Sequence, residues 1–199
     1  MEEIEEIIIS MLAIVVAFSI ANWGIDVFFQ GDFFLRAIVL MFTVGVGFIS
    51  HELGHKYAAE KFGSASRFMM WPQGLVFMLL LAPLGVIFAA PGAVYIFKRM
   101  SKQENGVVSL AGPIVNMLLY MFFALILLGS ASAGIQLSSV VATICAIGMQ
   151  INALLAVFNL LPVFILDGAK VFAWDWRIWG AAFILCVVMM FSAGALVAL

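Results

Sequence analysis

Long uncharged stretches, separated by short charged segments, organise this chain. A charge at the centre of a bilayer is costly, so the uncharged stretches are candidate membrane spans. At a rise of about 1.5 Å per residue, about 20 apolar residues cross a hydrocarbon core of about 30 Å. The candidate spans are residues 7–25, 33–62, two helices within 105–166 that separate near 129–134, and 178–199. The pattern predicts an all-α polytopic membrane protein with about five to six transmembrane helices.

Residues 68–97 are also uncharged, but they do not match a pair of spans. The stretch is too short for two spans of about 20 residues each and a turn. It is also interrupted by Pro72, Pro83 and Pro91, which cannot continue a regular helix. Irregular backbone at this depth is tolerated only where protein covers it or a cavity hydrates it. We therefore expect a membrane-associated re-entrant or β-hairpin segment after the second span.

The composition excludes an ordinary soluble domain. The chain has 199 residues, 66% of them hydrophobic and 10% charged, and its mean hydropathy is +1.21. Soluble domains are about 25% charged. Eleven acidic and nine basic residues give a net charge of −2. The chain therefore has no excess of basic residues that would indicate a nucleic-acid partner. We expect one integral-membrane domain over residues 1–199 with no soluble appended domain. Cys145 and Cys186 lie in apolar runs and are expected to be core thiols.

The second span carries the most informative cluster of ionisable residues. The only histidines, His51 and His55, flank Glu52 in the string HELGH. On a helix, positions i and i+4 share a face, so both imidazoles can reach one metal ion with the glutamate beside it. Ionisable groups within a span are costly unless they are paired, which favours a functional metal site. Two ligands one turn apart on a single helix cannot take the opposite axial positions of a haem.

Two imidazoles leave a zinc ion short of a third protein ligand. Asp167 ends a long uncharged run and precedes Gly168, so it is a candidate ligand and equally a candidate turn residue, because Asp-Gly is a common turn pair. Asp175 is the alternative carboxylate, between two tryptophans in a segment expected at the membrane interface. From the residues alone, the choice between ligand and turn stays open.

Basic residues predict the orientation of the chain in the membrane. Eight of the nine lie in three loop regions, and only Arg36 lies elsewhere. The eight are Lys56, Lys61, Arg67, Lys98, Arg99, Lys102, Lys170 and Arg177. Because short cytosolic loops are enriched in Lys and Arg, we expect these regions to be cytosolic. His55 precedes Lys61 by less than two turns, so we expect the active site nearer the cytosolic side of a multi-pass protein in the cell membrane of a prokaryote.

Three sequence motifs together resemble the site-2 protease family of intramembrane zinc metalloproteases. The motifs are HELGH at 51–55, AGPIVN at 111–116, and NLLP at 159–162 followed by LDG at 166–168. The resemblance covers residues from about 35 to 170. It implies that His51, His55 and Asp167 bind one Zn²⁺ per chain. It also implies that Glu52 is the catalytic base and that Asn159 lies in the site as a substrate or oxyanion partner.

The resemblance also implies the reaction and its setting. The expected activity is hydrolysis of peptide bonds within or near transmembrane segments of membrane-protein substrates in the lipid bilayer, as in regulated intramembrane proteolysis. Residues 67–72 are expected to present an edge strand to the substrate, with a lipid-covering flap as the equal alternative for this stretch. Two alternatives stay open: a metal-binding or metal-transporting membrane protein, and a catalytically inactive scaffold of the same fold. The sequence also leaves the oligomeric state open, and iron or cobalt tolerates the same ligand set.

Overall fold

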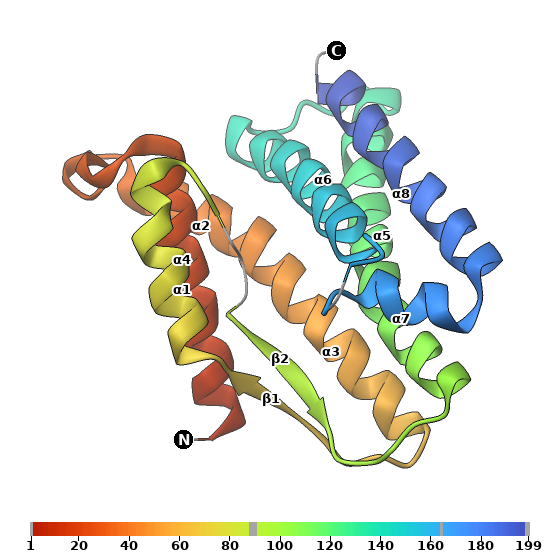
Figure 1. The fold of residues 1–199 in the computed structure, drawn as a ribbon. Coiled ribbons are helices and arrows are strands. Elements are labelled where there is room, and N and C mark those ends of the chain that lie inside the picture. The colour runs from red at the N-terminus through yellow and green to blue at the C-terminus, as the bar shows by residue number, and fades with distance from the viewer. Residues whose placement is uncertain (1, 88–90, 164, 198–199) are drawn as a thin grey trace.

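The computed structural model describes residues 2–87, 91–163 and 165–197 and has five helices long and apolar enough to cross a membrane (Figure 1). Helices α5 (Lys102–Ser132) and α6 (Ser139–Asn159) are joined by a short loop at 133–138, which overlaps the end of the division predicted near 129–134. The five are α1 (Glu3–Trp23), the continuous helical segment Phe33–Lys61, α5 (Lys102–Ser132), α6 (Ser139–Asn159) and α8 (Trp176–Val197). The predicted all-α polytopic membrane fold with five to six spans is therefore confirmed.

The second span is not a uniform α-helix. It consists of α2 (Phe33–Leu40), a π-helical turn η2 (Met41–Gly45) and α3 (Val46–Lys61). A short 3₁₀ helix, η1 (Ile25–Phe29), connects it to α1. Single π-turns within helices occur frequently at functional sites, and this one directly precedes the helix that carries both histidines.

The segment after the second span forms two strands with a helix between them. Strand β1 (Ser66–Met70) pairs antiparallel with β2 (Gly92–Ile96). Between the strands lie α4 (Pro72–Leu81) and the 3₁₀ turn η3 (Ala82–Leu84). Pro72 is the first residue of α4, where its missing N–H costs no helical hydrogen bond. The sequence predicted a re-entrant or β-hairpin segment here, and the structure combines the two, except for residues 88–90, which lie outside the described residues.

The inserted helix α4 lies beside α1 (Figure 1). Ile14 and Ala17 of α1 share a buried apolar cluster with Leu75 and Met78 of α4. Leu40 and Val44, from the first half of the second span, complete the same cluster. The apolar insertion thus returns along the first span, and the strands on either side of it are held next to α3.

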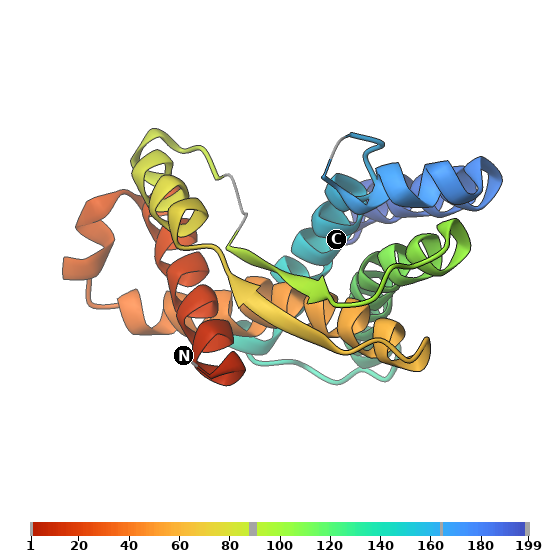
Figure 2. The same cartoon turned by 60° about the horizontal axis from the view of Figure 1, so that its bottom comes forward.

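The remaining helices form a second group around α5. Helix α5 packs against α3, α6 and the short helix α7 (Asp167–Trp174), and α8 covers α6 and α7. Close contact between α5 and α6 depends on Gly148, since a Cβ there would lie 2.5 Å from the Phe123 ring. Cys145 and Cys186 are buried free thiols in these cores, as the sequence predicted. Figure 2 shows the strands on one side and α5 to α8 on the other, with α3 in contact with both.

The two ends of α5 are expected to lie on opposite sides of the membrane. We predict that a membrane-impermeant maleimide, applied to intact cells, labels only one of the variants Gln103→Cys and Gln136→Cys, because both positions are exposed and the span separates them. Permeabilised cells should show labelling of both. The buried native thiols should contribute little background. Labelling of both variants from one side would contradict this span.

Candidate metal centre

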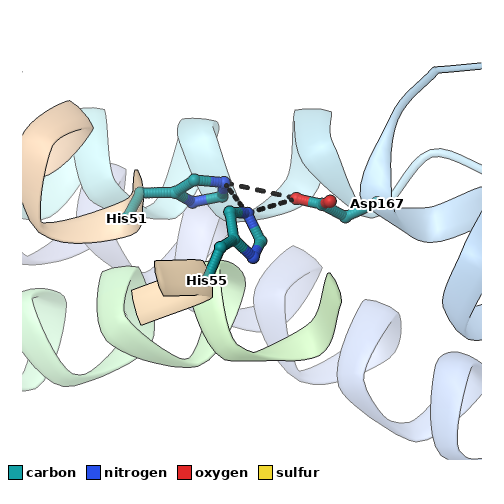
Figure 3. A group of neighbouring side chains, drawn as sticks. All are labelled: His51, His55 and Asp167. Carbon is teal, nitrogen blue, oxygen red and sulfur yellow. Dashed lines mark hydrogen bonds and ion pairs between the residues drawn. The ribbon is translucent and has the colours of Figure 1, made fainter. Parts of the chain in front are cut away.

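The side chains of His51 and His55 point to the same place as the carboxylate of Asp167 (Figure 3). The histidines lie one turn apart on α3, and Asp167 is the first residue of α7. His51 Nε2 and His55 Nε2 are 3.0 Å apart, and Asp167 Oδ2 lies 3.2 Å from the first and 3.0 Å from the second. All three residues are buried. One donor atom from each residue therefore faces a common point.

The outer nitrogen of each imidazole is held by a carbonyl oxygen. His51 Nδ1 lies 2.6 Å from Asn116 Oδ1, and His55 Nδ1 lies 2.8 Å from the backbone oxygen of Val108. Because a carbonyl oxygen can only accept, each Nδ1 must carry the proton and donate it. The Nε2 atoms are then free of a proton in the neutral rings and present lone pairs to the common point. This is the tautomer that a metal ion requires.

The spacing of the three donors fits a zinc ion. Around a four-coordinate zinc with ligands at about 2.0 Å, neighbouring ligand atoms lie about 3.3 Å apart. The distances of 3.0 to 3.2 Å between the donors of His51, His55 and Asp167 are close to that value. Catalytic zinc sites use three protein ligands and keep a fourth position for water. The donor set therefore matches a catalytic zinc site better than a closed structural one.

Asp167 is placed as an ionised donor. The first-turn position on α7 favours a negative charge, because helix N-termini carry partial positive charge. Lys170 Nζ lies 3.6 Å from the other carboxylate oxygen, Oδ1, on the same short helix. One oxygen thus faces the histidines and the other faces a cation.

Two glycines allow the backbone to approach the site. A Cβ at Gly112 of α5 would lie 2.5 Å from His55 Nε2 and 2.6 Å from His51 Nε2, in the space next to the metal-binding lone pairs. A Cβ at Gly168 would lie 2.1 Å from the Leu160 carbonyl oxygen. Gly168 therefore lets the start of α7 pack against the end of α6, which places Asp167 opposite the histidines. Each glycine belongs to one of the sequence motifs.

Two buried amide side chains, those of Asn116 and Asn152, support the Nδ1 side of His51. Asn116 donates through Nδ2 to the Gly47 carbonyl at 3.1 Å and to Asn152 Oδ1 at 2.9 Å, and Asn152 donates to the Gly148 carbonyl at 2.8 Å. Both side chains are fully buried, so these bonds fix which atom of Asn116 faces the imidazole. Asn116 belongs to the motif at 111–116, but the sequence predicted no role for it. A polar amide in an uncharged span was the available signal.

Glu52 lies beside the donor group without joining it. Its side chain lines the same cavity as the two histidines and Asp167. Its Oε2 accepts a hydrogen bond from the Val94 N–H of β2 at 3.1 Å. The three-residue group whose donor atoms lie within 4.8 Å of one another consists of the histidines and Asp167. Glu52 therefore lies in the cavity outside the donor group, and its role as a base stays a prediction.

Asn159 is the last residue of α6 and also lines this cavity. Its Nδ2 donates to the Leu155 carbonyl of its own helix at 2.9 Å. The structure thus brings Asn159 to the same cavity as Glu52 but not into the donor group. Asp175, the alternative ligand from the sequence, lies elsewhere: its Oδ1 accepts from the Arg177 N–H at 2.8 Å, at the start of α8. Asp175 is a helix-capping residue in this structure.

The cavity above the donor group has a volume of about 360 Å³ and is partly open. Strand β2 forms one of its sides, and Phe158, Ile165 and Leu166, around the end of α6, form another. An apolar wall with a few polar groups at its base is typical of a substrate site.

The strand edge that faces the cavity belongs to β2. The N–H groups of Phe68 and Met70 point away from β2 and donate to glutamates of α1. Their partners in the antiparallel register, Val94 and Gly92, must likewise direct their backbone groups away from β1. The Val94 N–H accordingly reaches Glu52 in the cavity. The sequence placed the substrate-facing edge on residues 67–72, but the outward N–H groups of Phe68 and Met70 are already bonded to glutamates, and β2 is the strand whose outer N–H reaches the cavity.

Fold and site together define a class: a polytopic membrane protein with a buried His/His/Asp centre able to hold zinc, and a glutamate beside it. No family model and no solved structure matches the chain. Two relatives do. A protein of Methanocaldococcus jannaschii named "Putative zinc metalloprotease MJ0611" is 41% identical over 180 residues, which cover 89% of this chain and 86% of that protein. "Putative zinc metalloprotease YwhC" of Bacillus subtilis is 33% identical over 147 residues, 66% of each chain.

The chain belongs to this family of zinc metalloproteases. The membership rests on the match to the Methanocaldococcus protein, which extends over most of both chains. It agrees with the donor group of His51, His55 and Asp167 and with the apolar helices around it. Zinc is thus the metal indicated both by the relatives and by the chemistry of the donors.

A side chain at Gly112 should prevent metal binding. We predict that wild-type protein purified without added zinc contains about one zinc ion per chain and that Gly112→Ala protein contains little, because the new methyl group would fill the space beside both Nε2 atoms. Gly129→Ala, on the same helix with open space around it, is the matched control and should keep its zinc. Equal zinc contents in the two variants would contradict the assigned site.

Removing the Asn116 side chain, which bonds His51 Nδ1, should weaken zinc binding without abolishing it. We predict that Asn116→Ala lowers zinc affinity by about 10- to 100-fold, the usual effect of losing an outer hydrogen-bond partner of a ligand. Competition with a fluorescent zinc chelator measures the change. Asn22→Ala removes an exposed amide that bonds only within α1 among the described contacts, and its affinity should match that of the wild type. An unchanged affinity in Asn116→Ala would refute the supporting role.

Proposed function

We propose that this protein is an intramembrane protease of the site-2 type, which hydrolyses peptide bonds within or near transmembrane segments of other membrane proteins. The observation that carries the proposal is the position of the donor group. His51 and His55 lie on a membrane-spanning helix, and the cavity next to them is lined by a strand edge and by Glu52. A soluble peptide substrate would not require a catalytic centre enclosed by apolar helices.

The roles of the residues follow from their placement. When bound, zinc would polarise the scissile carbonyl and lower the pKa of a water molecule at the fourth position. Glu52 would take a proton from that water and pass it to the leaving amine, as a general base and then a general acid. His51, His55 and Asp167 hold the metal, and Asn116 keeps His51 in the binding tautomer.

The substrate would lie in an extended form along β2. Gly92, Val94 and Ile96 direct backbone donors and acceptors away from β1, and an added strand can pair with them independently of its side chains. A transmembrane substrate helix must first unwind, because its backbone groups are already bonded to each other. Segments that contain helix-breaking residues should therefore be preferred. The Val94 N–H bonds to Glu52 in this structure, so an arriving strand would compete for that donor.

Asn159 is proposed to contact the substrate from the side opposite β2. A side-chain amide carries two N–H groups, and the bond to Leu155 uses one of them. The second can donate to a carbonyl oxygen of a peptide in the cavity. This role matches the sequence prediction of a substrate or oxyanion partner.

The active site is proposed to open toward the cytosol of a prokaryotic cell. The two relatives come from an archaeon and a bacterium. The C-terminal end of α3, which follows His55, lies next to the loop that joins β2 to α5 (Figure 1). Lys61, Lys98 and Arg99 lie at this end of α3 and in that loop. His55 is separated from Lys61 by about 9 Å of helix, so water has a short path from that side. Release of a membrane-tethered regulator is the proposed outcome of cleavage.

Variants that lose zinc can be compared with variants that lose only cleavage, and this comparison tests the proposed roles of the residues. We predict that Glu52→Gln keeps its zinc but cleaves at least about 100-fold more slowly, since it loses the general base. Asp167→Ala should lose both zinc and activity, whereas Asp175→Ala, a carboxylate outside the donor group, should lose neither. The probe is a single-pass signal-anchor protein with an Asn-Pro pair in its transmembrane segment, co-reconstituted in liposomes.

Two results would refute this proposal. One is undiminished cleavage by Glu52→Gln, because the reaction would then need no base at that position. The other is failure of zinc-loaded wild type to cleave any member of a panel in which the Asn-Pro pair is moved along the probe's transmembrane segment.

A further inference from the structure

Two glutamates in the first turn of α1 bind the outer edge of β1. Glu3 Oε1 accepts from the Phe68 N–H at 2.9 Å, and Glu6 Oε2 accepts from the Met70 N–H at 2.8 Å. The acceptors lie three residues apart on one helix face, and the donors are alternate residues on one strand edge. The two carboxylates thus occupy the positions that carbonyl oxygens of a third strand would take.

The same carboxylates are paired with cations from neighbouring elements. Lys56 Nζ lies 2.7 and 2.6 Å from the two oxygens of Glu3, and Arg67 donates to Glu6 Oε1 at 2.9 Å. Lys56 directly follows His55 on α3. Glu3 therefore connects three elements: the first span, the outer strand of the sheet and the helix that carries the metal-binding histidines. The Glu3 and Glu6 side chains are only 25% and 13% exposed, so losing these partners would leave charges poorly solvated.

A two-stranded sheet in a membrane protein has two edges with unpaired backbone groups. Here α1 closes the edge of β1, and the edge of β2 stays open toward the catalytic cavity. The closed edge cannot pair with a substrate strand. The contacts of Glu3 also fix the distance between the sheet and α3, on which Glu52 lies.

We propose, on the basis of the proposed function, that Glu3 and Glu6 are positioning residues for the substrate. They close the outer edge of β1, so that a substrate strand can add only at β2, and they hold β2 next to Glu52. Neither carboxylate lies in the metal-binding group or lines the catalytic cavity. Their effect on the reaction is therefore exerted through the sheet.

The first turn of α1 supplies its own control. Glu2 and Glu5 form a capping box, in which Glu5 Oε2 accepts from the Glu2 N–H at 2.8 Å. Both residues are exposed. The double variants Glu3→Ala/Glu6→Ala and Glu2→Ala/Glu5→Ala therefore remove equal charge from one turn, but only the first removes the acceptors of β1.

Hydrogen–deuterium exchange of zinc-loaded protein in nanodiscs, followed by mass spectrometry, measures the closed edge directly. We expect exchange in peptides covering β1 to rise about tenfold or more in Glu3→Ala/Glu6→Ala, since bonds to charged acceptors are the stronger ones. Zinc content should stay at one per chain. Glu3→Gln/Glu6→Gln should restore most of the protection, because an amide oxygen still accepts a hydrogen bond. The single variants Glu3→Ala and Glu6→Ala should raise exchange at the Phe68 N–H and at the Met70 N–H, respectively. They keep the test available if the double variant folds poorly.

Kinetics with the signal-anchor probe test the consequence for the substrate. The alanine double variant should raise KM several-fold with kcat nearly unchanged, and the glutamine variant should recover most of the loss. Unchanged exchange in β1, equal exchange in the Glu2/Glu5 control, or a fall in kcat at constant KM would each overturn the positioning role. If zinc-loaded wild type cleaves no probe while exchange follows the expected pattern, the proposed function fails and the closed edge of β1 stands.

Discussion

The structure depends on the need to satisfy every polar group that is buried between apolar helices. The imidazoles of His51 and His55 each use one nitrogen to bond a carbonyl oxygen of α5, which leaves the other nitrogen facing Asp167. These bonds fix the rotation of each ring and the position of its proton. The close packing of α3 on α5 at Gly112, the buried pair Asn116 and Asn152, and the placement of α7 all follow from the same requirement.

The sheet meets this requirement in a different way at each edge. On β1, carboxylates from α1 accept the outer N–H groups, and on β2 the corresponding groups face a cavity that contains Glu52. Backbone N–H groups that would be costly in lipid are thus bonded to carboxylates, to Glu3 and Glu6 on β1 and to Glu52 on β2. The two edges differ because only the edge of β2 lies in the cavity that contains the donor group.

Sequence patterns predicted the features that depend on neighbouring residues. Uncharged stretches located the spans, and the i, i+4 spacing located the histidine pair and Glu52. The role of Asp167 stayed open between ligand and turn because the choice depends on a contact with α3 that spacing along the chain does not reveal. The same limit applies to Asn116, whose partner His51 lies 65 residues away. Residues 68–97 were recognised as irregular, but the assignment of the free edge needed the strand register and the carboxylates of α1.

Two imidazoles and one carboxylate form the zinc centre inferred for this protein. X-ray absorption at the zinc K-edge of the purified protein measures these ligands. We predict a shell of four nitrogen or oxygen ligands at about 2.0 to 2.1 Å, with the scattering pattern of two imidazoles and no sulfur. A zinc–sulfur distance of about 2.3 Å would contradict this ligand set. It would require a cysteine ligand, whereas Cys145 and Cys186 are buried in the helix cores.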